Sequence, residues 1–407
     1  MSHLVTRRWE PDPLLPAVPG SGMPFQYEAY VPNEIAGIDP SLSARTARLL
    51  SEADTAVREL NEDLPGIAGL EAMSRQLLRQ ESVASSRIEG LEMSQRRLAR
   101  AAVVDDDQHR DTSAEAILAN IAAMEHAISV TSVQPHLEVD ALIDIHRVLM
   151  EKTRDAHIAG IVRASQNWIG GNGYNPRGAA FIPPPEDEVG RLLADLVMFM
   201  NRQDLPITFQ AAVAHAQFET IHPFADGNGR TGRCLIHVVY KRGRAADRFV
   251  PPVSLVLATE GDAYIRGLTS YREDRLQDWC ADFALTVIRA CRAARLLAQH
   301  LAALQTTWLE QLGPARQDSS SRRLIAVVAG QPILRVQHVV ELLDVGTSAA
   351  HKALNELEAA GVLKQVTVGK RNRAWEAVGL LALIDAFVRT LATPEGAAKP
   401  VRRAPRP

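Results

Sequence analysis

The sequence predicts an all-α fold followed by a small winged helix-turn-helix domain, and three observations support this prediction. Aromatic residues make up only 5% of the 407 residues, whereas Ala and Leu abound. Most apolar positions recur at helical spacing. After about residue 310 the pattern changes to short helices followed by β-prone runs. A chain of this length suggests two or three domains and can bury a large core.

The N-terminal part is predicted to be an arm followed by helices. Residues 1–40 are rich in Pro and Gly and lack periodicity, so we expect an extended arm that packs on the body. A first helix is predicted over residues 40–63. A second runs over residues 70–89 and ends at Gly90, a residue type that often terminates helices. Two further amphipathic helices are expected between residues 114 and 151.

A β-hairpin is predicted to interrupt the helices over residues 160–185. Two short β-prone runs in this stretch are separated by glycines and a proline. Helical spacing returns over residues 187–203, 207–221 and 256–306. These helices are expected to complete an all-α bundle.

The C-terminal part is predicted to form the winged helix-turn-helix. Helices are expected over residues 324–329, 336–343 and 347–360, and two strands then flank a wing at residues 369–372. Contact with DNA would use exposed polar and basic side chains of the third helix and the wing: Thr347, Ser348, His351, Lys352, Lys370, Arg371 and Arg373. A protein-binding module remains the alternative, because the third helix also carries Glu356 and Glu358.

Composition narrows the class of protein. The formal net charge of −3 gives no general signal for nucleic-acid binding. Three cysteines (Cys234, Cys280 and Cys291) lie in helical stretches without metal-ligand spacing, which indicates free thiols in a reducing compartment. There is no positively charged N-terminal segment leading into an apolar run, and no apolar run of about 18 residues. We therefore expect a cytoplasmic protein without a membrane span.

Residues 222–233 (HPFADGNGRTGR) are the most informative segment. His222 is a titratable base with an expected pKa near neutrality, and Asp226 is a ligand for a hard cation. A Gly-Asn-Gly turn and two arginines follow. Glycines let backbone N–H groups converge on an anion, and a helix predicted over residues 231–240 directs its positive dipole end toward the same place. This combination indicates phosphate chemistry assisted by a base.

Three other interpretations of this segment were weighed. Gly227, Gly229 and Gly232 satisfy the loose G-x-G-x-x-G dinucleotide pattern, and two of them have P-loop spacing. Both motifs require a preceding strand, but residues 207–221 have helical spacing. A P-loop also needs Lys and Ser/Thr where Arg233 and Cys234 stand. The third interpretation, a helix cap followed by a simple turn, does not require the aspartate and both arginines.

The segment matches the pattern H-x-F-x-[DE]-G-N-G-R-x-x-R at every defined position, and in this it resembles the Fic family. Members of that family mostly transfer AMP from ATP to hydroxyl side chains of proteins. The resemblance implies a Fic-type helical bundle that uses ATP and Mg²⁺. His222 would be the base, Phe224 would anchor the loop and Asp226 would hold Mg²⁺. The phosphates would be bound by the remaining residues of the motif: Gly227, Asn228, Gly229, Arg230 and Arg233.

A second motif lies upstream at residues 85–90. Ser85, Glu89 and Gly90 fit [ST]-x-x-x-E-[GN], which resembles the inhibitory motif of many Fic proteins. Ser85 and Glu89 lie one turn apart on one helix face. The resemblance implies that Glu89 pairs with Arg233 and withholds it from the γ-phosphate. The alternative is a solvated glutamate at a helix end. In the same family the hairpin is a flap that binds a target protein by strand addition, here near residues 169–182.

The predicted parts are an N-terminal arm with helices (1–110), a catalytic core (111–308), a linker (309–320), the winged helix (321–392) and a basic, disordered tail (393–407). The leading hypothesis is an autoinhibited protein adenylyltransferase. The alternatives are a DNA-binding regulator with a nucleotide-sensing core, and a Fic enzyme that uses another phosphate donor or removes AMP. The sequence also leaves open a homodimer and the identity of the target.

Overall fold

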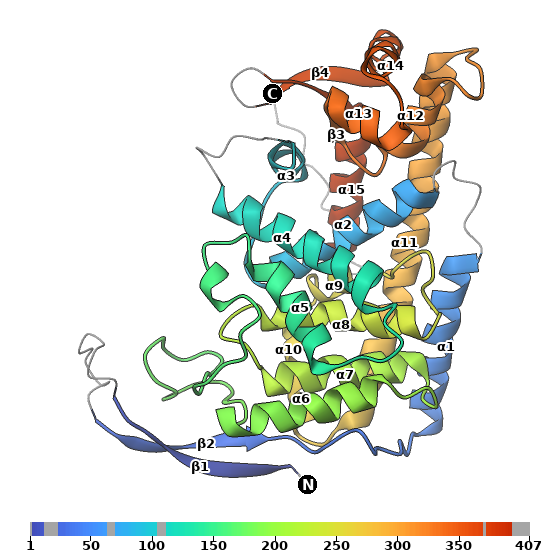
Figure 1. Ribbon diagram of the computed structural model, residues 1–407. Helices are drawn as coiled ribbons and strands as arrows, with labels where there is room; N and C mark the ends of the chain where they lie inside the picture. The colour runs from blue at the N-terminus through green and yellow to red at the C-terminus, as the bar shows by residue number, and fades with distance from the viewer. Residues whose placement is uncertain (1, 12–22, 63–69, 104–110, 369–371, 393–407) are drawn as a thin grey trace, which may run out of the picture. The chain divides into compact units, whose positions relative to one another are not determined.

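The computed structural model describes residues 2–11, 23–62, 70–103, 111–368 and 372–392, and this part of the chain is predominantly helical, as predicted (Figure 1). Backbone contacts divide the chain into two compact units. Unit 1 comprises Met1–Leu64, Met73–Met93 and Val104–Ala294, and unit 2 comprises Pro65–Ala72, Ser94–Val103 and Arg295–Pro407. The division falls inside one long helix, α11 (Leu276–Leu312). The core boundary predicted at residue 308 therefore also lies within a helix.

The helices that lie wholly or partly in unit 1 are α1 (Ala44–Glu62), α2 (Leu70–Ile88), α4 (Thr112–His126), α5 (Val139–Met150), α6 (Glu186–Met200), α7 (Ile207–Ile221), α8 (Asn228–Arg242), α9 (Val253–Leu257), α10 (Gly261–Arg272) and α11. A π-helical turn (Ala127–Thr131) continues α4, and a 3-10 turn (Ala156–Ile158) follows α5.

Helix α7 is the centre of the core of unit 1. Every residue from Thr208 to Ile221 is buried, and the helix packs against α1, α6, α8 and α10. Its alanines allow close approach of these neighbours. The motif of residues 222–233 follows directly after α7, so the motif begins at the end of a buried helix.

The N-terminal arm is more ordered than the sequence analysis expected. Strands β1 (His3–Trp9) and β2 (Phe25–Val31) pair as an antiparallel ribbon, in which His3 faces Val31 and Trp9 faces Phe25. The alternation of Phe25, Tyr27, Ala29 and Val31 toward the body was the available signal, because a period of two is typical of a half-buried strand.

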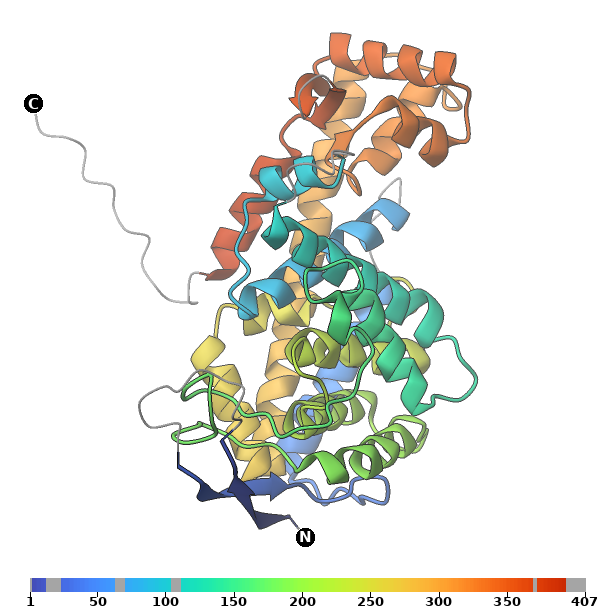
Figure 2. The same ribbon diagram turned by 60° about the vertical axis from the view of Figure 1, so that its left-hand side comes forward.

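The predicted flap is a loop closed by a single β-bridge between Ile169 and Phe181. Its ladder is therefore shorter than the expected hairpin. The N-terminal ribbon lies beside it in both views (Figures 1 and 2), and the Tyr30 N–H donates to the Ile182 carbonyl at 3.0 Å. Trp9 packs edge-on against Trp168 with ring centres 5.4 Å apart.

Two cation–π contacts add to the attachment of the flap. The Arg177 guanidinium lies 4.5 Å from the centre of the Phe25 ring. The Arg272 guanidinium of α10 lies 3.7 Å from the centre of the Phe181 ring. Such contacts are each worth about 0.5–2 kcal/mol. The ribbon, the flap and α10 are therefore fastened to one another.

Unit 2 contains α3 (Gln95–Ala101), α12 (Ser320–Val328), α13 (Val336–Leu343), α14 (Thr347–Ala359) and α15 (Leu380–Ala392), with strands β3 (Ile333–Leu334), β4 (Leu363–Val368) and β5 (Asn372–Ala377). The strands form an antiparallel sheet in the order β3-β5-β4. The helix–strand–helix–helix–strand–strand order is that expected for a winged helix, an assignment that stays a prediction. Gly346, rather than the expected Thr347, is the N-cap of α14.

Two further expectations concern the whole chain. Cys234, Cys280 and Cys291 are buried free thiols, as predicted. None of the helices among the described residues is both long and apolar enough to cross a bilayer.

Candidate active site

The loop between α7 and α8 begins and ends with left-handed backbone. His222 follows α7 with φ 50° and ψ 60°, and Gly227 precedes α8 with φ 78°. Glycine adopts this conformation freely, whereas the Cβ of His222 disfavours it by about 1–2 kcal/mol. Helix α8 begins at Asn228, earlier than the predicted residue 231, so part of the glycine segment forms its first turn.

Two side-chain amides hold the ring of His222. The Nδ2 atoms of Asn167 and Asn228 lie 3.0 and 3.1 Å from His222 Nδ1. The Asn228 amide is itself oriented by Phe224, because its Oδ1 accepts from the Phe224 N–H and its Nδ2 donates to the Phe224 carbonyl, both at 2.8 Å. Because the amide N–H groups donate to Nδ1, they favour the neutral tautomer of His222 that carries its proton on Nε2.

The pKa of His222 differs from the expected value near neutrality. Burial lowers the pKa of His222 to about 3, and the nearby positive charges of Arg163 and Arg272 lower it further, against a small opposing effect of Glu89. The physical cause is that a charged imidazolium loses hydration and meets two guanidinium groups. The ring is therefore neutral throughout the physiological pH range.

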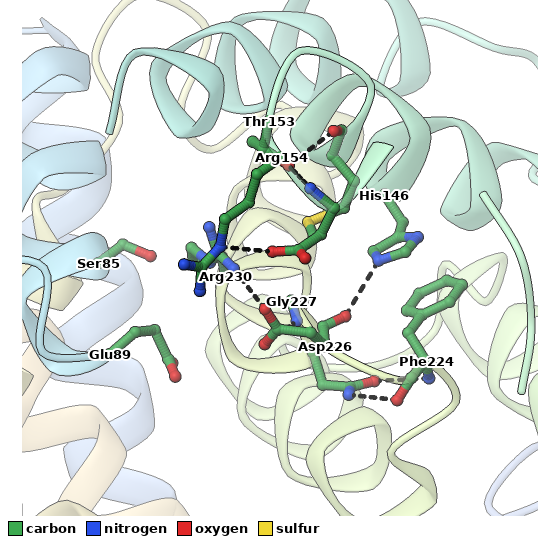
Figure 3. A network of polar contacts seen from close by, with 12 residues as sticks. Ser85, Glu89, His146, Thr153, Arg154, Phe224, Asp226, Gly227 and Arg230 are labelled. Atoms are coloured by element: carbon green, nitrogen blue, oxygen red, sulfur yellow. Dashed lines mark hydrogen bonds and ion pairs between the residues drawn. The ribbon is translucent and has the colours of Figure 1, made fainter. Parts of the chain in front are cut away.

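The backbone carbonyl of Asp226 is held by His146, a histidine to which the sequence assigned no role. His146 of α5 accepts from the Gly160 N–H at Nδ1 (3.1 Å), so its Nε2–H donates to the Asp226 carbonyl at 3.0 Å. Its ring stacks on Phe224 with centres 3.7 Å apart. Phe224 is fully buried. Figure 3 shows how this stack leaves the Asp226 carboxylate on the other side of the loop.

The Asp226 side chain is 61% exposed and faces the N-terminus of α8, where Arg230 Nη2 lies 3.5 Å from Oδ2. Among the described residues, no group of three or more His, Cys, Asp or Glu side chains could hold a metal ion. Mg²⁺ is commonly bound by one or two carboxylates together with substrate phosphates. An exposed carboxylate beside a helix N-terminus fits that mode of binding.

Arg233 is occupied by Ser85 of α2 and by Glu89, which directly follows that helix. Its Nε donates to Ser85 Oγ at 2.8 Å, and its Nη2 donates to the Ser85 carbonyl at 2.9 Å and to Glu89 Oε1 at 2.7 Å. The Arg233 side chain is 1% exposed, whereas that of Glu89 is 38% exposed. Gly90 follows with φ 78° and ends the helix. The structure thus brings the two sequence motifs into direct contact.

The carboxylate of Glu89 also covers the glycine turn. A Cβ added to Gly229 would overlap Glu89 Oε1 and lie 2.9 Å from Arg233 Nη1. The oxygen therefore lies against the first turn of α8, where backbone N–H groups attract anions. Burial has the largest single effect and raises the pKa of Glu89, but the charge and hydrogen bond of Arg233, together with the nearby Arg230, lower it by more in sum, so the net shift of this pKa is downward. Glu89 is an ionised carboxylate at an anion-binding position.

Helices α2 and α8 pair in opposite directions along one polar face. Glu81 and Ser85 lie four residues apart on α2 and so share one side of that helix, and Glu89 follows four residues later, directly after the helix ends. Glu81 Oε1 lies 2.9 Å from His237 Nε2 on α8, one turn after Arg233, and both side chains are fully buried. Glu81 Oε2 also accepts from the Ser254 N–H at 2.8 Å. This buried contact anchors the helix that carries Glu89.

Arg163 and Asn167 fasten the loop to the base of the flap. The Arg163 side chain donates to the carbonyls of Ser165, Pro184 and His222, the last at 2.9 Å. Asn167 Nδ2 also lies 3.2 Å from the His222 carbonyl. No spacing in the sequence connects these two residues to the motif. The bridge between Val162 and Phe224 places them there.

Glu219 of α7 is a further charged group beside Arg233. It is 6% exposed, and its Oε1 has no hydrogen-bond partner among the described residues. Burial raises the pKa of Glu219 to about 7, with Arg233 opposing and Glu89 adding to the shift. A Cβ on Gly232 would lie 2.6 Å from this oxygen. Gly232 is therefore required to make room for Glu219.

The residues predicted to contact DNA belong to unit 2. On α14, Lys352 is 78% exposed and lies 3.9 Å from Glu356. Thr347, Ser348 and His351 are exposed on the same helix, and Arg373 is exposed on β5. Lys370 and Arg371 lie outside the described residues, as does the tail over residues 393–407.

The geometry defines a helical protein with an anion-binding loop, a histidine and a carboxylate, and family comparison identifies the class. Residues 136–240 match the model of the Fic/DOC family, and residues 47–129 match the model of the Fic/DOC family N-terminal region. These two matched regions of the chain belong to the Fic/DOC family.

Curated relatives resemble part of the chain. "Protein adenylyltransferase fic-1" of Caenorhabditis briggsae is 31% identical over 132 residues, which cover 31% of this chain and 23% of the relative. "Probable protein adenylyltransferase aq_aa38" of Aquifex aeolicus (strain VF5) is 40% identical over 63 residues, which cover 15% of this chain and 20% of the relative. The chain thus spans less than a third of the length of these relatives.

A solved structure agrees with the helical fold. The crystallised fragment of Fic-1 from C. elegans (aa134 - 508) superposes with a TM-score of 0.50 at 22% identity, covering 65% of this chain and 74% of that one. At this identity the likeness concerns the fold alone.

Proposed function

We propose that this protein is a protein adenylyltransferase that transfers AMP from ATP to a hydroxyl side chain of another protein, and that Glu89 holds it in an inhibited state. The observation that carries the proposal is the contact between Glu89 and Arg233, at 2.7 Å, beside a complete His222–Arg233 motif. Curated relatives named protein adenylyltransferases support the reaction class.

In the proposed reaction the target hydroxyl oxygen attacks the α-phosphorus of ATP. The bond between the α-phosphorus and the oxygen that leads to the β-phosphorus breaks, and pyrophosphate leaves. His222 accepts the hydroxyl proton. The N-terminus of α8 and Arg230 stabilise the phosphate charge.

Asp226 would hold Mg²⁺, which would supply charge neutralisation and alignment of the phosphates. Arg233 would bind the outer phosphates once Glu89 has moved. The flap near residues 169–182 would bind the backbone of the target protein by strand addition. Residues that hold phosphates do not select the base of the nucleotide. The proposal that ATP is the donor therefore rests on the relatives that are named protein adenylyltransferases.

Intact-mass analysis after incubation with Mg-ATP tests this function. We expect Glu89→Gly protein to gain the mass of AMP on itself or on a lysate protein, the wild type to gain little, and Glu89→Gly/His222→Ala to gain none. Glu92→Gly is a matched control, because Glu92 makes only an exposed 3.7 Å ion pair with Arg87. The absence of any AMP adduct in the Glu89→Gly sample contradicts the proposal.

The same assay separates the related Fic activities. An adduct formed only with another nucleotide would identify a different donor. Loss of AMP from a previously modified protein, dependent on Glu89, would identify the reverse reaction with Glu89 positioning a water. A homodimer, which the proposal does not require, would be detected by light scattering on the same samples.

DNA binding by unit 2 is a second candidate function, favoured by the exposed polar face of α14. We expect duplex binding that weakens with salt and is reduced in Lys352→Ala/Arg373→Ala protein, because each lost phosphate contact lowers the salt slope by about one unit. Lys370→Ala/Arg371→Ala tests the wing in the same way. Binding that is absent in the wild type, or unchanged in both variants, speaks for a protein-binding module instead.

A further inference from the structure

A pocket of about 670 Å³ lies in unit 1 at the C-terminal end of α8. The helix spans roughly 20 Å between this pocket and the motif of residues 222–233, at a rise of about 1.5 Å per residue. The other walls are residues 132–135, which follow the π-helical turn, the end of α6 and the start of α7. Helices α6, α7 and α8 lie side by side (Figure 1). Pockets of about 300–1,000 Å³ are typical of sites for small molecules.

Positive charge predominates in the lining of this pocket. One acidic side chain, Asp247, stands against four basic ones: Arg202, Lys241, Arg242 and Arg244. Arg202 is paired at 2.6 Å with Asp204, so the other three basic side chains and Asp247 leave an excess of two positive charges. A larger groove of unit 1, about 840 Å³ beside α10, has three basic and three acidic side chains. The excess is therefore a property of this pocket, on a chain whose formal net charge is −3.

Arg242 is half-buried and has no carboxylate partner among the described residues. Its guanidinium donates to the Gln134 carbonyl and, at 3.0 Å, to Asn201 Oδ1. Both acceptors are neutral. Burial lowers the pKa of Arg242, and no nearby carboxylate opposes this shift. The acceptors hold the guanidinium in place and leave its charge uncompensated, which favours an anion in the pocket.

The basic side chains are not needed to cap α8. At its end the N–H groups of Gly243 and Arg244 donate to the carbonyls of Val239 and Lys241, both at 3.0 Å. The Lys241 ammonium donates to the Asp247 carbonyl instead. Arg244 lies beyond the helix, is exposed, and has no side-chain hydrogen bond or ion pair within the part of the chain that the structure describes. Its guanidinium is therefore available to a ligand.

We propose that this pocket binds a small organic phosphate, held by the guanidinium groups of Arg242 and Arg244. Guanidinium forks match phosphate oxygens in paired hydrogen bonds. The excess of two positive charges suits a phosphate monoester, which carries about two negative charges near neutral pH, better than a single carboxylate. Val133 and Pro135 of the same lining would contact the organic part. The site shares no residue with the motif of residues 222–233, so the inference is independent of the proposed function.

Titration calorimetry with phenyl phosphate on the full wild-type chain tests the site, with phenol as the uncharged control. We expect saturable binding that weakens as salt is added. The Kd should rise about tenfold in Arg244→Ala, because one hydrogen-bonded charge is lost, and Arg244→Lys should recover part of the affinity. The matched control is Arg248→Ala, which removes an exposed positive charge four residues away that does not line the pocket.

Arg230→Ala separates this site from phosphate binding beside the motif, and its affinity for phenyl phosphate should equal that of the wild type. A loss in Arg230→Ala without one in Arg244→Ala places the probe beside the motif and overturns the inference. Equal affinity in Arg244→Ala and the wild type, or an equal loss in Arg248→Ala, overturns it as well. So does a wild type that binds no phenyl phosphate, or that binds phenol or benzoate as tightly. AMP transfer by Glu89→Gly protein decides only the proposed function, so the two can fail separately.

Discussion

His222 is placed by one residue of its own motif and by two residues outside it. The ring lies between the amides of Asn167 and Asn228, and its backbone carbonyl accepts from Arg163. These contacts hold a residue whose φ of 50° is unfavourable for a side chain with a Cβ. Asn167 is therefore a positioning residue.

Asn167→Ala, made in the Glu89→Gly background, is expected to lower the AMP transfer rate by about tenfold or more while the KM for ATP stays nearly constant. The reason is that the phosphate-binding loop keeps its other supports while the ring of His222 gains freedom. Initial rates at varied ATP measure both quantities. A rise in KM at constant kcat would show that Asn167 acts on nucleotide binding instead.

Glu219 gives the protein a pH-dependent contribution to stability. Its pKa is raised to about 7 in the folded state by burial, so the folded state holds its proton more tightly than the unfolded state. The stabilisation is present at pH values below the ordinary pKa of a glutamate and is lost as the pH rises through about 7.

Glu219→Gln is therefore expected to gain stability relative to the wild type as the pH rises from about 5 to about 8, by roughly 2–3 kcal/mol. Melting temperatures at the two pH values measure the effect. Glu151→Gln changes an exposed carboxylate and serves as the control. A difference from wild type that does not change with pH would show that Glu219 does not titrate in this range.

At the scale of elements, the contact between α2 and α8 connects inhibition to folding. Arg233 and His237 on α8 meet Ser85 and Glu81 on α2 and Glu89 directly after it, so the Glu89 carboxylate follows a helix with a buried polar anchor. Asn120 of α4 also holds α2, where its Nδ2 donates to the Ser82 carbonyl at 2.8 Å. Release of Glu89 thus involves its own helix end more readily than the whole of α2.

Glu81→Ala is expected to destabilise the protein by about 3 kcal/mol, since it leaves His237 and the Ser254 N–H buried without their partner. It should also raise AMP transfer above the wild-type level, although less than Glu89→Gly does. Glu81→Gln keeps an acceptor, so its stability should lie between that of the wild type and that of Glu81→Ala. Urea unfolding and the AMP transfer assay measure these effects. Unchanged stability in Glu81→Ala would show that the anchor is not needed.

At the scale of the whole molecule, strands β1 and β2 contact and brace the flap although they are far apart from it in the sequence. A chain that begins at residue 32 lacks Trp9, Phe25 and Tyr30, and with them the contacts to Trp168, Arg177 and Ile182. We expect trypsin to cut after Arg177 faster in this fragment than in the full chain. The rate of cutting after Arg316, in unit 2, should not change. Equal rates at Arg177 would contradict a bracing role for the ribbon.

The sequence predicted the helical class from its apolar spacing, and it predicted the contact between Glu89 and Arg233 because the two motifs have defined residue types at fixed spacing. It did not predict the roles of His146, Arg163 and Asn167, which act through contacts between segments that have no common pattern. It also placed the pKa of His222 near neutrality, because burial and the approach of two arginines are properties of the fold. The ribbon was missed because the Pro- and Gly-rich composition of the arm outweighed the alternation in β2.

Under the proposed function, the carboxylate that overlaps the Cβ position of Gly229 makes Glu89 a competitor of the nucleotide that is part of the chain. If it is docked in about 99% of molecules, the apparent affinity of the site for nucleotide falls about 100-fold, equivalent to about 2.7 kcal/mol. A change of about 1.4 kcal/mol in docking then alters nucleotide occupancy tenfold. A partner that binds anywhere on the end of α2 can therefore set the concentration of ATP at which the enzyme begins to work, without touching the nucleotide.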